Sequence, residues 1–355
     1  MRRRLRELGY SVGRFPPGPL NAIVDVPGVR VGHLTLARLH TGVTAVLPHD
    51  GNPFAEKVLA GSHVVNGFGK ATGLTQLEEL GTLESPILLT GTTAVGAVWE
   101  GGQRWLLELN PAAARDRDTV NVVVAECFDG WLSDARALSV RPQHALEAIA
   151  AAREDEVGEG SLGAGAGTTC FGYKSGVGTS SRRAGDCTLG CLVVSNFGAA
   201  RDRHLLEAGA SAEEAPIPDV GPARPEGRGG SAIVVLATDA PLSDRQLRRL
   251  ARRAAFGLVR AGSFASNGSG EYAIAFSTAH RLPHRADGPY TELRVLRDDS
   301  QELRELFEAA AEVAHEAVLG SLCGGDATEG RDGHRVEAFP RELLQRLPGV
   351  RRSAR

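Results

Sequence analysis

A glycine-rich run places one serine at the start of an apolar, β-branched segment. Ser231 follows Gly230 and precedes residues 232–237, which read Ala-Ile-Val-Val-Leu-Ala. An uninterrupted apolar run of this kind predicts a strand that is buried on both faces. A hydroxyl held where such a strand begins can act as a nucleophile when a base stands beside it. Glycine-rich loops that enter core strands are common, so this stretch alone favours a purely structural interpretation of Ser231.

A second hydroxyl is followed two positions later by a carboxylate. Ser269 and Glu271 lie where residues 270–277 begin to resemble a strand. Side chains two apart on a strand project to the same face. A hydroxyl and a carboxylate aimed together can orient a nucleophile and its base. The same two side chains can equally hydrogen-bond their own turn, so both interpretations stay open at this point.

Two further polar side chains end or interrupt predicted buried strands. Glu126 follows the apolar residues 122–125, and Asn196 follows the apolar residues 192–194 and Ser195. A carboxylate in so apolar a run must be paired or must face a cavity. Glu126 is therefore equally consistent with a structural ion pair and with an anchor for a substrate ammonium group.

Residues 163–182 contain glycines at a spacing that resembles a dinucleotide-binding loop. Such a loop should follow a strand and open a helix, whereas a polar, strand-like run from residue 172 to residue 182 follows here. We therefore reject phosphate binding and predict a hairpin whose small residues pack close to another backbone. His33, a lone histidine after a predicted strand, is assigned a structural role.

The remaining chain supplies the elements that must position these groups. Strands and helices occur in groups without regular strand–helix alternation, which favours a layered α+β fold over a Rossmann sheet. Helical periodicity predicts helices over residues 142–155 and 300–322, and residues 243–246 form a capping box that opens a third helix. The proline-rich residues 199–230 read as an exposed linker, where a chain can be cut without loss of the fold.

Composition excludes several classes of protein. The chain has 355 residues, 42% of them hydrophobic, which is enough for one large or two ordinary domains. Its 40 basic and 43 acidic residues leave a net charge of −3, so no nucleic-acid or membrane partner is predicted. Five cysteines are an odd number that fits no disulfide framework, and no cysteine–histidine spacing indicates a metal site.

Targeting signals are not evident in the sequence. The basic residues 2–6 are not followed by the apolar stretch that a secretory signal requires. No window approaches the length of a transmembrane helix. We therefore expect a soluble, cytoplasmic protein.

Seven stretches together resemble one family, the DmpA-like L-aminopeptidase/D-esterase-amidases, which include the β-peptidyl aminopeptidases. None is decisive alone, but they follow the family order and span nearly the whole chain. The matching stretches are residues 21–33, 66–73, 167–182, 194–198, 230–241, 267–271 and 328–336. This resemblance reverses the structural interpretation of Ser231.

The resemblance implies an α+β fold, a four-layer αββα sandwich like that of the ornithine acetyltransferases. It implies that residues 1–355 form a single catalytic domain, made as an inactive precursor that cuts itself between Gly230 and Ser231. The products would be a large chain of residues 1–230 and a small chain of residues 231–355. It further implies a homotetramer of processed pairs that needs no metal or cofactor.

The resemblance also implies a role for each candidate residue. Ser231 would be the nucleophile, and its new α-amine, with a pKa near 8, would be a usable base at neutral pH. Ser269 and Glu271 would orient the nucleophile and relay protons. Asn196 would donate to the oxyanion, and Glu126 would hold the free amino group of a peptide, amide or ester substrate.

One residue departs from the family pattern. Family members carry a tyrosine two residues after the glutamate, where this chain has Phe128. A phenylalanine cannot donate a hydrogen bond to the oxyanion. We therefore hypothesise that catalysis is weaker here, or that it relies more on Asn196 and on backbone N–H groups.

Two alternatives to the self-processing aminopeptidase remain. The first is an acyltransferase that resembles the ornithine acetyltransferases, but those use a threonine nucleophile, so Ser231 counts against it. The second is an unprocessed binding protein that keeps the fold without the chemistry, which only Phe128 favours. The sequence does not distinguish L-α, D-α and β-amino substrates.

Overall fold

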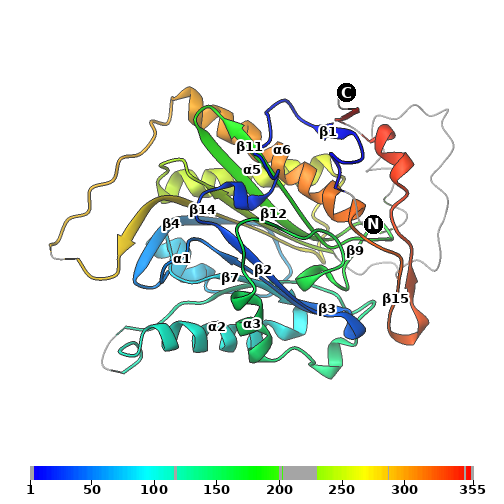
Figure 1. The fold of residues 1–355 in the computed structure, drawn as a ribbon, viewed down its shortest axis with the longest axis horizontal. Coiled ribbons are helices and arrows are strands. Elements are labelled where there is room, and N and C mark those ends of the chain that lie inside the picture. The colour runs from blue at the N-terminus through cyan, green and yellow to red at the C-terminus, as the bar shows by residue number, and fades with distance from the viewer. Residues whose placement is uncertain are drawn as a thin grey trace.

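The computed structural model describes residues 4–115, 118–199, 202, 230–286, 288–347 and 349–352. Two β-sheets lie face to face and each carries helices on its outer face, so the chain forms four layers in the order α-β-β-α (Figure 1). This arrangement agrees with the predicted αββα sandwich. The linker predicted over residues 199–230 falls almost entirely outside the described residues.

The six-stranded sheet has the order β11-β12-β13-β14-β4-β6. The pair β13–β14 is parallel and the other neighbouring pairs are antiparallel. The strand that Ser231 begins, β13, lies in the interior of this sheet. The strands are β4 (Glu56–Gly67), β6 (Thr82–Leu83), β11 (Val177–Ala184), β12 (Cys187–Asn196), β13 (Ser231–Thr238) and β14 (Gly270–Pro283).

The five-stranded sheet has the order β2-β3-β7-β8-β5. Its one parallel pair is β7–β8, which places the ends of these two strands side by side. Glu126 lies near the end of β8. The strands are β2 (Arg30–Leu36), β3 (Thr41–Leu47), β5 (Ala71–Thr72), β7 (Ile87–Gly91) and β8 (Val123–Cys127).

Helices cover the two outer faces. Helices α5 (Asp244–Arg260) and α6 (Gln301–Cys323) pack on the six-stranded sheet, and α2 (Val95–Leu109) and α3 (Pro142–Ala150) pack on the five-stranded sheet (Figure 1). The short helix α1 (Leu74–Leu80) contacts β4. Shorter described strands are β1 (Tyr10–Val12), β9 (Thr169–Cys170), β10 (Tyr173–Lys174), β15 (Thr328–Glu329), β16 (Arg335–Val336) and β17 (Val350–Arg352).

The apolar run of β13 is buried on both faces, as its composition predicts. Ile233 and Val235 belong to the core between the two sheets. Val234 and Leu236 belong to the core between this sheet and helices α5 and α6. Alternate residues of a strand point to opposite faces, so each apolar side chain of the run has a core to enter.

Helix boundaries follow the sequence signals with one exception. The capping box is present at α5, where the Ser243 hydroxyl accepts from the Gln246 N–H, and α6 begins and ends within one residue of the predicted bounds. The helix predicted over residues 142–155 was too long, since α3 ends at Ala150. The chain leaves the helix there because Arg153 exchanges two backbone hydrogen bonds of 2.9 Å with Val31 of β2.

The glycine-rich residues 163–182 form one 3-10 turn at Gly163–Gly165 and then strands, rather than a phosphate-binding loop. Strands β9 and β10 pair as a short hairpin, and β11 follows. A Cβ added at Gly165 would lie 2.4 Å from the Val177 nitrogen, and one at Gly178 would lie 1.8 Å from the Ala317 oxygen. Close backbone packing, as predicted, explains these glycines.

None of the described helices is long and apolar enough to span a lipid bilayer.

Candidate active site

Three neighbouring interior strands of the six-stranded sheet bring the predicted residues together where β12 ends and β13 and β14 begin. Asn196 is the last residue of β12 and pairs with Ser231, the first residue of β13. Ser231 pairs on its other side with Gly270, the first residue of β14. Ser269 and Glu271 flank Gly270 in the sequence. Strand register therefore gathers side chains that are separated by long stretches of chain.

The Ser231 hydroxyl is buried and accepts two hydrogen bonds. One comes from the Asn196 Nδ2 at 3.2 Å and the other from the backbone N–H of Phe128 at 3.2 Å. Because Phe128 follows β8 of the other sheet, the nucleophile candidate is contacted from both sheets. The Asn196 Oδ1 accepts the Thr169 N–H at 3.1 Å, which orients the amide so that its NH₂ group faces Ser231.

Ser269 and Glu271 lie in direct contact. The Ser269 hydroxyl donates to Oε1 of Glu271. The other carboxylate oxygen, Oε2, is buried and has no hydrogen-bond partner among the described residues. Burial raises the pKa of Glu271 above its ordinary value, and the Ser269 hydrogen bond opposes that shift. The Glu271 carboxylate also accepts its own backbone N–H, so the pair combines the contact that a proton relay needs with the local hydrogen bond of a turn.

The residue before the nucleophile candidate is tightly held. The Gly230 carbonyl oxygen accepts the Gly270 N–H at 3.1 Å. A Cβ added at Gly230 would lie 2.7 Å from the Phe197 Cα and 2.8 Å from the Asn196 oxygen. Only glycine fits against this backbone. The peptide bond between Gly230 and Ser231 is therefore fixed at its carbonyl oxygen, next to the Ser231 hydroxyl.

Glu126 is buried at the end of β8. Its Oε1 accepts the Lys70 N–H at 3.0 Å, and its Oε2 accepts the Thr92 hydroxyl. Burial raises the pKa of Glu126, while these hydrogen bonds and the Lys70 charge lower it. Its hydrogen-bond partners among the described residues are a hydroxyl and a backbone N–H, so a structural ion pair does not account for this carboxylate.

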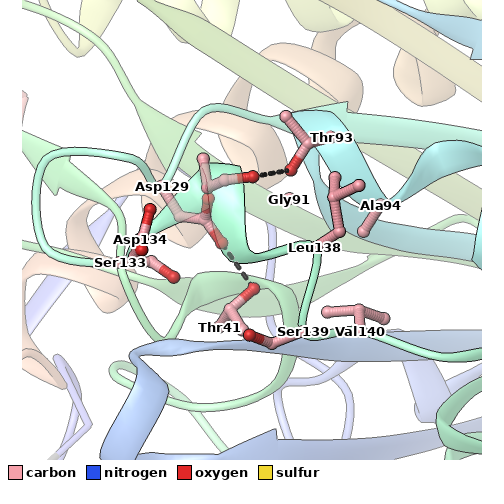
Figure 2. A pocket seen from close by; sticks show the side chains of 11 residues that line it. Thr41, Gly91, Thr93, Ala94, Asp129, Ser133, Asp134, Leu138, Ser139 and Val140 are labelled. Carbon is pink, nitrogen blue, oxygen red and sulfur yellow. Dashed lines mark hydrogen bonds between the residues drawn. The ribbon is translucent and has the colours of Figure 1, made fainter.

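A second buried carboxylate, Asp129, lies three residues after Glu126, and sequence reasoning missed it. Its Oδ2 accepts the Thr41 hydroxyl at 2.6 Å (Figure 2). Burial raises the pKa of Asp129 to about 6, and the Glu126 charge adds to the rise. In sequence, Asp129-Gly130 resembles an ordinary turn. The sequence signal that could have revealed Asp129 is its position three residues after Glu126, another carboxylate next to the same apolar run.

Asp129 borders a small cavity of about 10 Å³, roughly the space of one water molecule (Figure 2). The Thr93 hydroxyl closes one side by donating to the Ala135 carbonyl at 2.8 Å. The cavity lining comprises Thr41, Gly91, Thr93, Ala94, Asp129, Ser133, Asp134, Ala135, Leu138, Ser139 and Val140.

Two other chemically capable side chains are structural. The Cys127 thiol is fully buried and donates to the Val194 carbonyl at 3.4 Å, and burial raises its pKa, so it is not a reactive thiolate. The His33 ring lies 2.9 Å from the Thr44 hydroxyl, and burial lowers its pKa to about 4. The structural role predicted for His33 agrees with this environment.

Comparison with known proteins places the chain in one family. The model of peptidase family S58 matches residues 21–336. The β-peptidyl aminopeptidase of Sphingosinicella microcystinivorans is 37% identical over 97% of this chain and 91% of its own length. A protein of Mycobacterium leprae called an uncharacterised aminopeptidase is 27% identical over 88% of this chain and 92% of its own length.

Solved structures also match over nearly the whole chain. A protein from Pyrococcus horikoshii OT3 has a TM-score of 0.87 at 42% identity, covering 97% of this chain and 98% of that one. The β-aminopeptidase of a Burkholderia species has a TM-score of 0.86 at 38% identity, with the same coverage. The L-aminopeptidase D-Ala-esterase/amidase of Ochrobactrum anthropi, described as a variant of the Ntn hydrolase fold, has a TM-score of 0.83 at 32% identity, covering 96% and 97%.

These matches confirm the resemblance found in the sequence and the α+β fold that it implied. They also identify the chemistry, since the relatives with an assigned activity are aminopeptidases or amidases. The protein is an aminopeptidase/amidase hydrolase, and the chain belongs to peptidase family S58.

Proposed function

We propose that the protein is a self-processing serine aminopeptidase that cuts its own Gly230–Ser231 bond and then uses Ser231 as its nucleophile. The observation that carries this proposal is the surroundings of the Ser231 hydroxyl, which accepts from Asn196 and from the Phe128 N–H. The Gly230 carbonyl beside it is held by the Gly270 N–H. A nucleophile, an electrophilic carbonyl and a donor for the developing oxyanion thus adjoin one peptide bond.

In self-cleavage, the Ser231 Oγ attacks the Gly230 carbonyl carbon. The tetrahedral intermediate places its negative charge on the Gly230 oxygen, which the Gly270 N–H stabilises. The Gly230–Ser231 C–N bond then breaks as the hydroxyl proton passes to the departing nitrogen, and an ester to Oγ remains. Water hydrolyses this ester and leaves a Gly230 carboxylate and a free Ser231 amine.

The buried Ser269–Glu271 pair fits a proton relay for these steps. Burial raises the pKa of Glu271, which makes it a stronger base than an exposed carboxylate. In the processed enzyme, the Ser231 α-amine takes the Oγ proton as Oγ attacks the substrate carbonyl. Asn196 donates to the oxyanion, the leaving amine receives the proton, and water releases the N-terminal residue from the acyl-enzyme.

Glu126 is the proposed partner of the substrate's free amino group. Its carboxylate is buried, and Phe128, two residues further along the chain, donates its backbone N–H to the Ser231 hydroxyl. An ionised carboxylate in this setting binds an ammonium group strongly because little water competes. We expect Glu126→Gln to raise KM at least tenfold for a substrate with a free amine, as loss of a charged hydrogen bond of about 1.5–3 kcal/mol implies.

We further propose a substrate with an N-terminal β-amino residue. This choice rests on the relatives called β-peptidyl aminopeptidase and β-aminopeptidase, which are 36–38% identical to this chain. The test is hydrolysis of β-alanyl, L-alanyl and D-alanyl anilides. The largest kcat/KM for the β-alanyl compound would support the proposal, and a larger value for either α-amino compound would replace it.

The acyltransferase and binding-protein alternatives predict different outcomes in the same assay. An acyltransferase would pass the acyl group to an added amine in preference to water, and an unprocessed binding protein would release no aniline. We also propose a homotetramer of processed pairs, on the family resemblance alone. Light scattering of the purified protein would contradict the tetramer if it gave the mass of one pair.

A further inference from the structure

A lysine side chain is fully buried close to the candidate oxyanion site. Lys174, the last residue of β10, has 0% of its surface exposed. Its ammonium group donates to the Gly165 oxygen at 3.1 Å, to the Thr168 oxygen at 3.1 Å and to the Ser175 oxygen. Three backbone carbonyls of one loop therefore converge on a single nitrogen.

This geometry assigns a positive charge to Lys174. A charged lysine carries three N–H donors and no acceptor, whereas a neutral amine carries only two donors. The three carbonyl acceptors around Nζ match the three donors of the charged form. Burying a charge is costly unless strong interactions compensate for it. Backbone hydrogen bonds alone could fix this loop without the desolvation cost of a buried ammonium group.

One of the three carbonyls connects Lys174 to Asn196. The Thr168 carbonyl and the Thr169 N–H belong to the same peptide group. That N–H donates to Oδ1 of Asn196 at 3.1 Å, and Nδ2 of Asn196 donates to the Ser231 Oγ at 3.2 Å. The result is a continuous path of an ammonium group, a peptide group, a side-chain amide and the nucleophile.

Each amide along this path accepts at its oxygen and donates from its nitrogen. A hydrogen bond accepted at the oxygen polarises an amide and strengthens the hydrogen bond that its N–H donates. The charge of Lys174 therefore acts in one direction, toward the Asn196 NH₂ group.

We propose that Lys174 is a positioning residue that orients and polarises the Asn196 amide as an oxyanion donor. The proposal rests on the proposed role of Asn196 in the reaction. It goes beyond that role because it assigns part of the oxyanion stabilisation to a charge that touches neither substrate nor nucleophile.

The variants Lys174→Gln and Lys174→Met remove the charge, and Lys174→Arg keeps it. Activity is measured per mole of free Ser231 N-terminus, counted by mass spectrometry, so that incomplete self-cleavage does not count as slow catalysis. Removing one oxyanion donor lowers kcat by about 10²–10³-fold, so loss of a group that only polarises the donor is expected to lower it about five- to tenfold. KM should change by less than about twofold, because the interaction strengthens in the transition state. Lys174→Arg should retain most of the wild-type kcat.

Ser175→Ala is the matched control. The Ser175 hydroxyl holds the same loop by donating to the Ser195 carbonyl at 2.8 Å, and it lies 3.5 Å from the Thr168 hydroxyl. It is not one of the groups that link the Lys174 ammonium to Asn196, and alanine keeps the Ser175 carbonyl that Lys174 contacts. Its loss should lower thermal stability without the fall in kcat. Equal falls in kcat for Ser175→Ala and Lys174→Gln would reduce Lys174 to a loop support and overturn the proposal.

A double-mutant cycle with Asn196→Ala gives the decisive readout. If Lys174 acts through Asn196, then Lys174→Gln has almost no further effect on kcat once the amide is gone. A full five- to tenfold effect in that background would overturn the proposal. If Asn196→Ala itself leaves kcat unchanged, the proposed function of Asn196 fails, and that outcome is distinct from a failure confined to Lys174.

A backbone variant covers the case in which neither neutral variant folds. Replacing Thr169 by its α-hydroxy acid converts the 168–169 amide into an ester, which removes the N–H that Asn196 accepts and leaves the lysine in place. We expect this ester to lower kcat at least as much as Lys174→Gln is expected to. An unchanged kcat would refute the path directly.

Discussion

Three buried carboxyl groups have raised pKa values, and burial is the main cause for each. They are Glu126, Asp129 and Glu271. A charged group in a poorly solvated site interacts strongly with a substrate, but it also destabilises the fold that holds it. At the scale of single residues, each buried carboxylate therefore lowers the free energy of unfolding. Replacing one of them by a neutral residue of similar shape should raise it.

Asp129→Asn is expected to stabilise the protein in a pH-dependent way. The pKa of Asp129 is about 6 in the folded chain and 3.8 in the reference state. Between these values the folded state holds a proton that the unfolded state has lost, so wild-type stability falls as the pH rises from 4 to 6. Asparagine does not titrate and still accepts from Thr41. The variant should gain about 3 kcal/mol relative to wild type between pH 4 and pH 7.

Urea unfolding at several pH values measures this difference. Asp134→Asn is the control, because Asp134 lines the same cavity but is exposed. The control should follow the wild-type pH dependence. A constant stability difference between Asp129→Asn and wild type from pH 4 to pH 7 would show that Asp129 does not titrate as described.

Phe128→Tyr tests the departure from the family pattern. The backbone N–H of Phe128 already contacts the Ser231 hydroxyl, but its ring offers no donor. A tyrosine hydroxyl would add a second side-chain donor to the oxyanion, so kcat should rise several-fold, toward the roughly 10²-fold that a full donor can supply. Steady-state kinetics with one anilide substrate would check this. An unchanged rate would refute the hypothesis that Phe128 weakens catalysis.

At the scale of elements, the active site depends on how closely backbones approach. Strand β11 forms the edge of the sheet in which Ser231 begins an interior strand. It packs directly against α6 because Gly178 has no side chain. The sequence predicted close packing in this region from its small residues. It could not predict that strand β9 supplies the Thr169 N–H to Asn196, because that contact depends on tertiary placement of a backbone group rather than on residue type.

Gly178→Ala should destabilise the protein, and Gly96→Ala should not. A Cβ at Gly178 would meet the backbone of α6, which cannot move aside, so a loss of about 1–3 kcal/mol or more is expected. Gly96 is exposed in α2 with nothing within 4 Å of an added Cβ. Alanine there should add about 0.5–1 kcal/mol through helix propensity. Thermal unfolding compares the two, and similar melting temperatures would contradict the packing of β11 on α6.

At the scale of the whole molecule, the strand order explains what a cut before Ser231 would do. Strands β13 and β14, which would belong to the small chain, lie between β12 and β4, which would belong to the large chain. Their inward side chains share one core with the five-stranded sheet. The two chains would therefore stay together after cleavage, as parts of one sheet rather than as separate domains.

Much of this architecture was accessible from the sequence. Burial of β13 on both faces follows from its uninterrupted apolar run, and the α5 capping box and the α6 stripe follow from local sequence signals. The family resemblance supplied the layer order. Asp129 and Lys174 were not identified, because a turn-like aspartate and a lysine after a tyrosine carry no local mark of burial. Their environments arise only in the folded chain, where Asp129 meets Thr41 of β3 and Lys174 is linked through the 168–169 peptide group to Asn196 of β12.

The strand order predicts that the two chains of the processed protein elute together. Size-exclusion chromatography of processed protein in native buffer should give both chains in one peak, because separating them would break the ladders β12–β13 and β14–β4. Denaturant should release them only when the whole fold unfolds. Separate elution in native buffer would contradict the position of β13 in the sheet.

The central claim is that Ser231 becomes an N-terminal nucleophile, and intact mass under denaturing conditions tests it most directly. The account predicts two chains whose masses sum to the 37.4 kDa precursor plus one water, with the smaller chain beginning Ser231-Ala232-Ile233. Ser231→Ala should remain a single chain without activity. A wild-type protein that stays whole at 37.4 kDa and still hydrolyses its substrate would contradict the account.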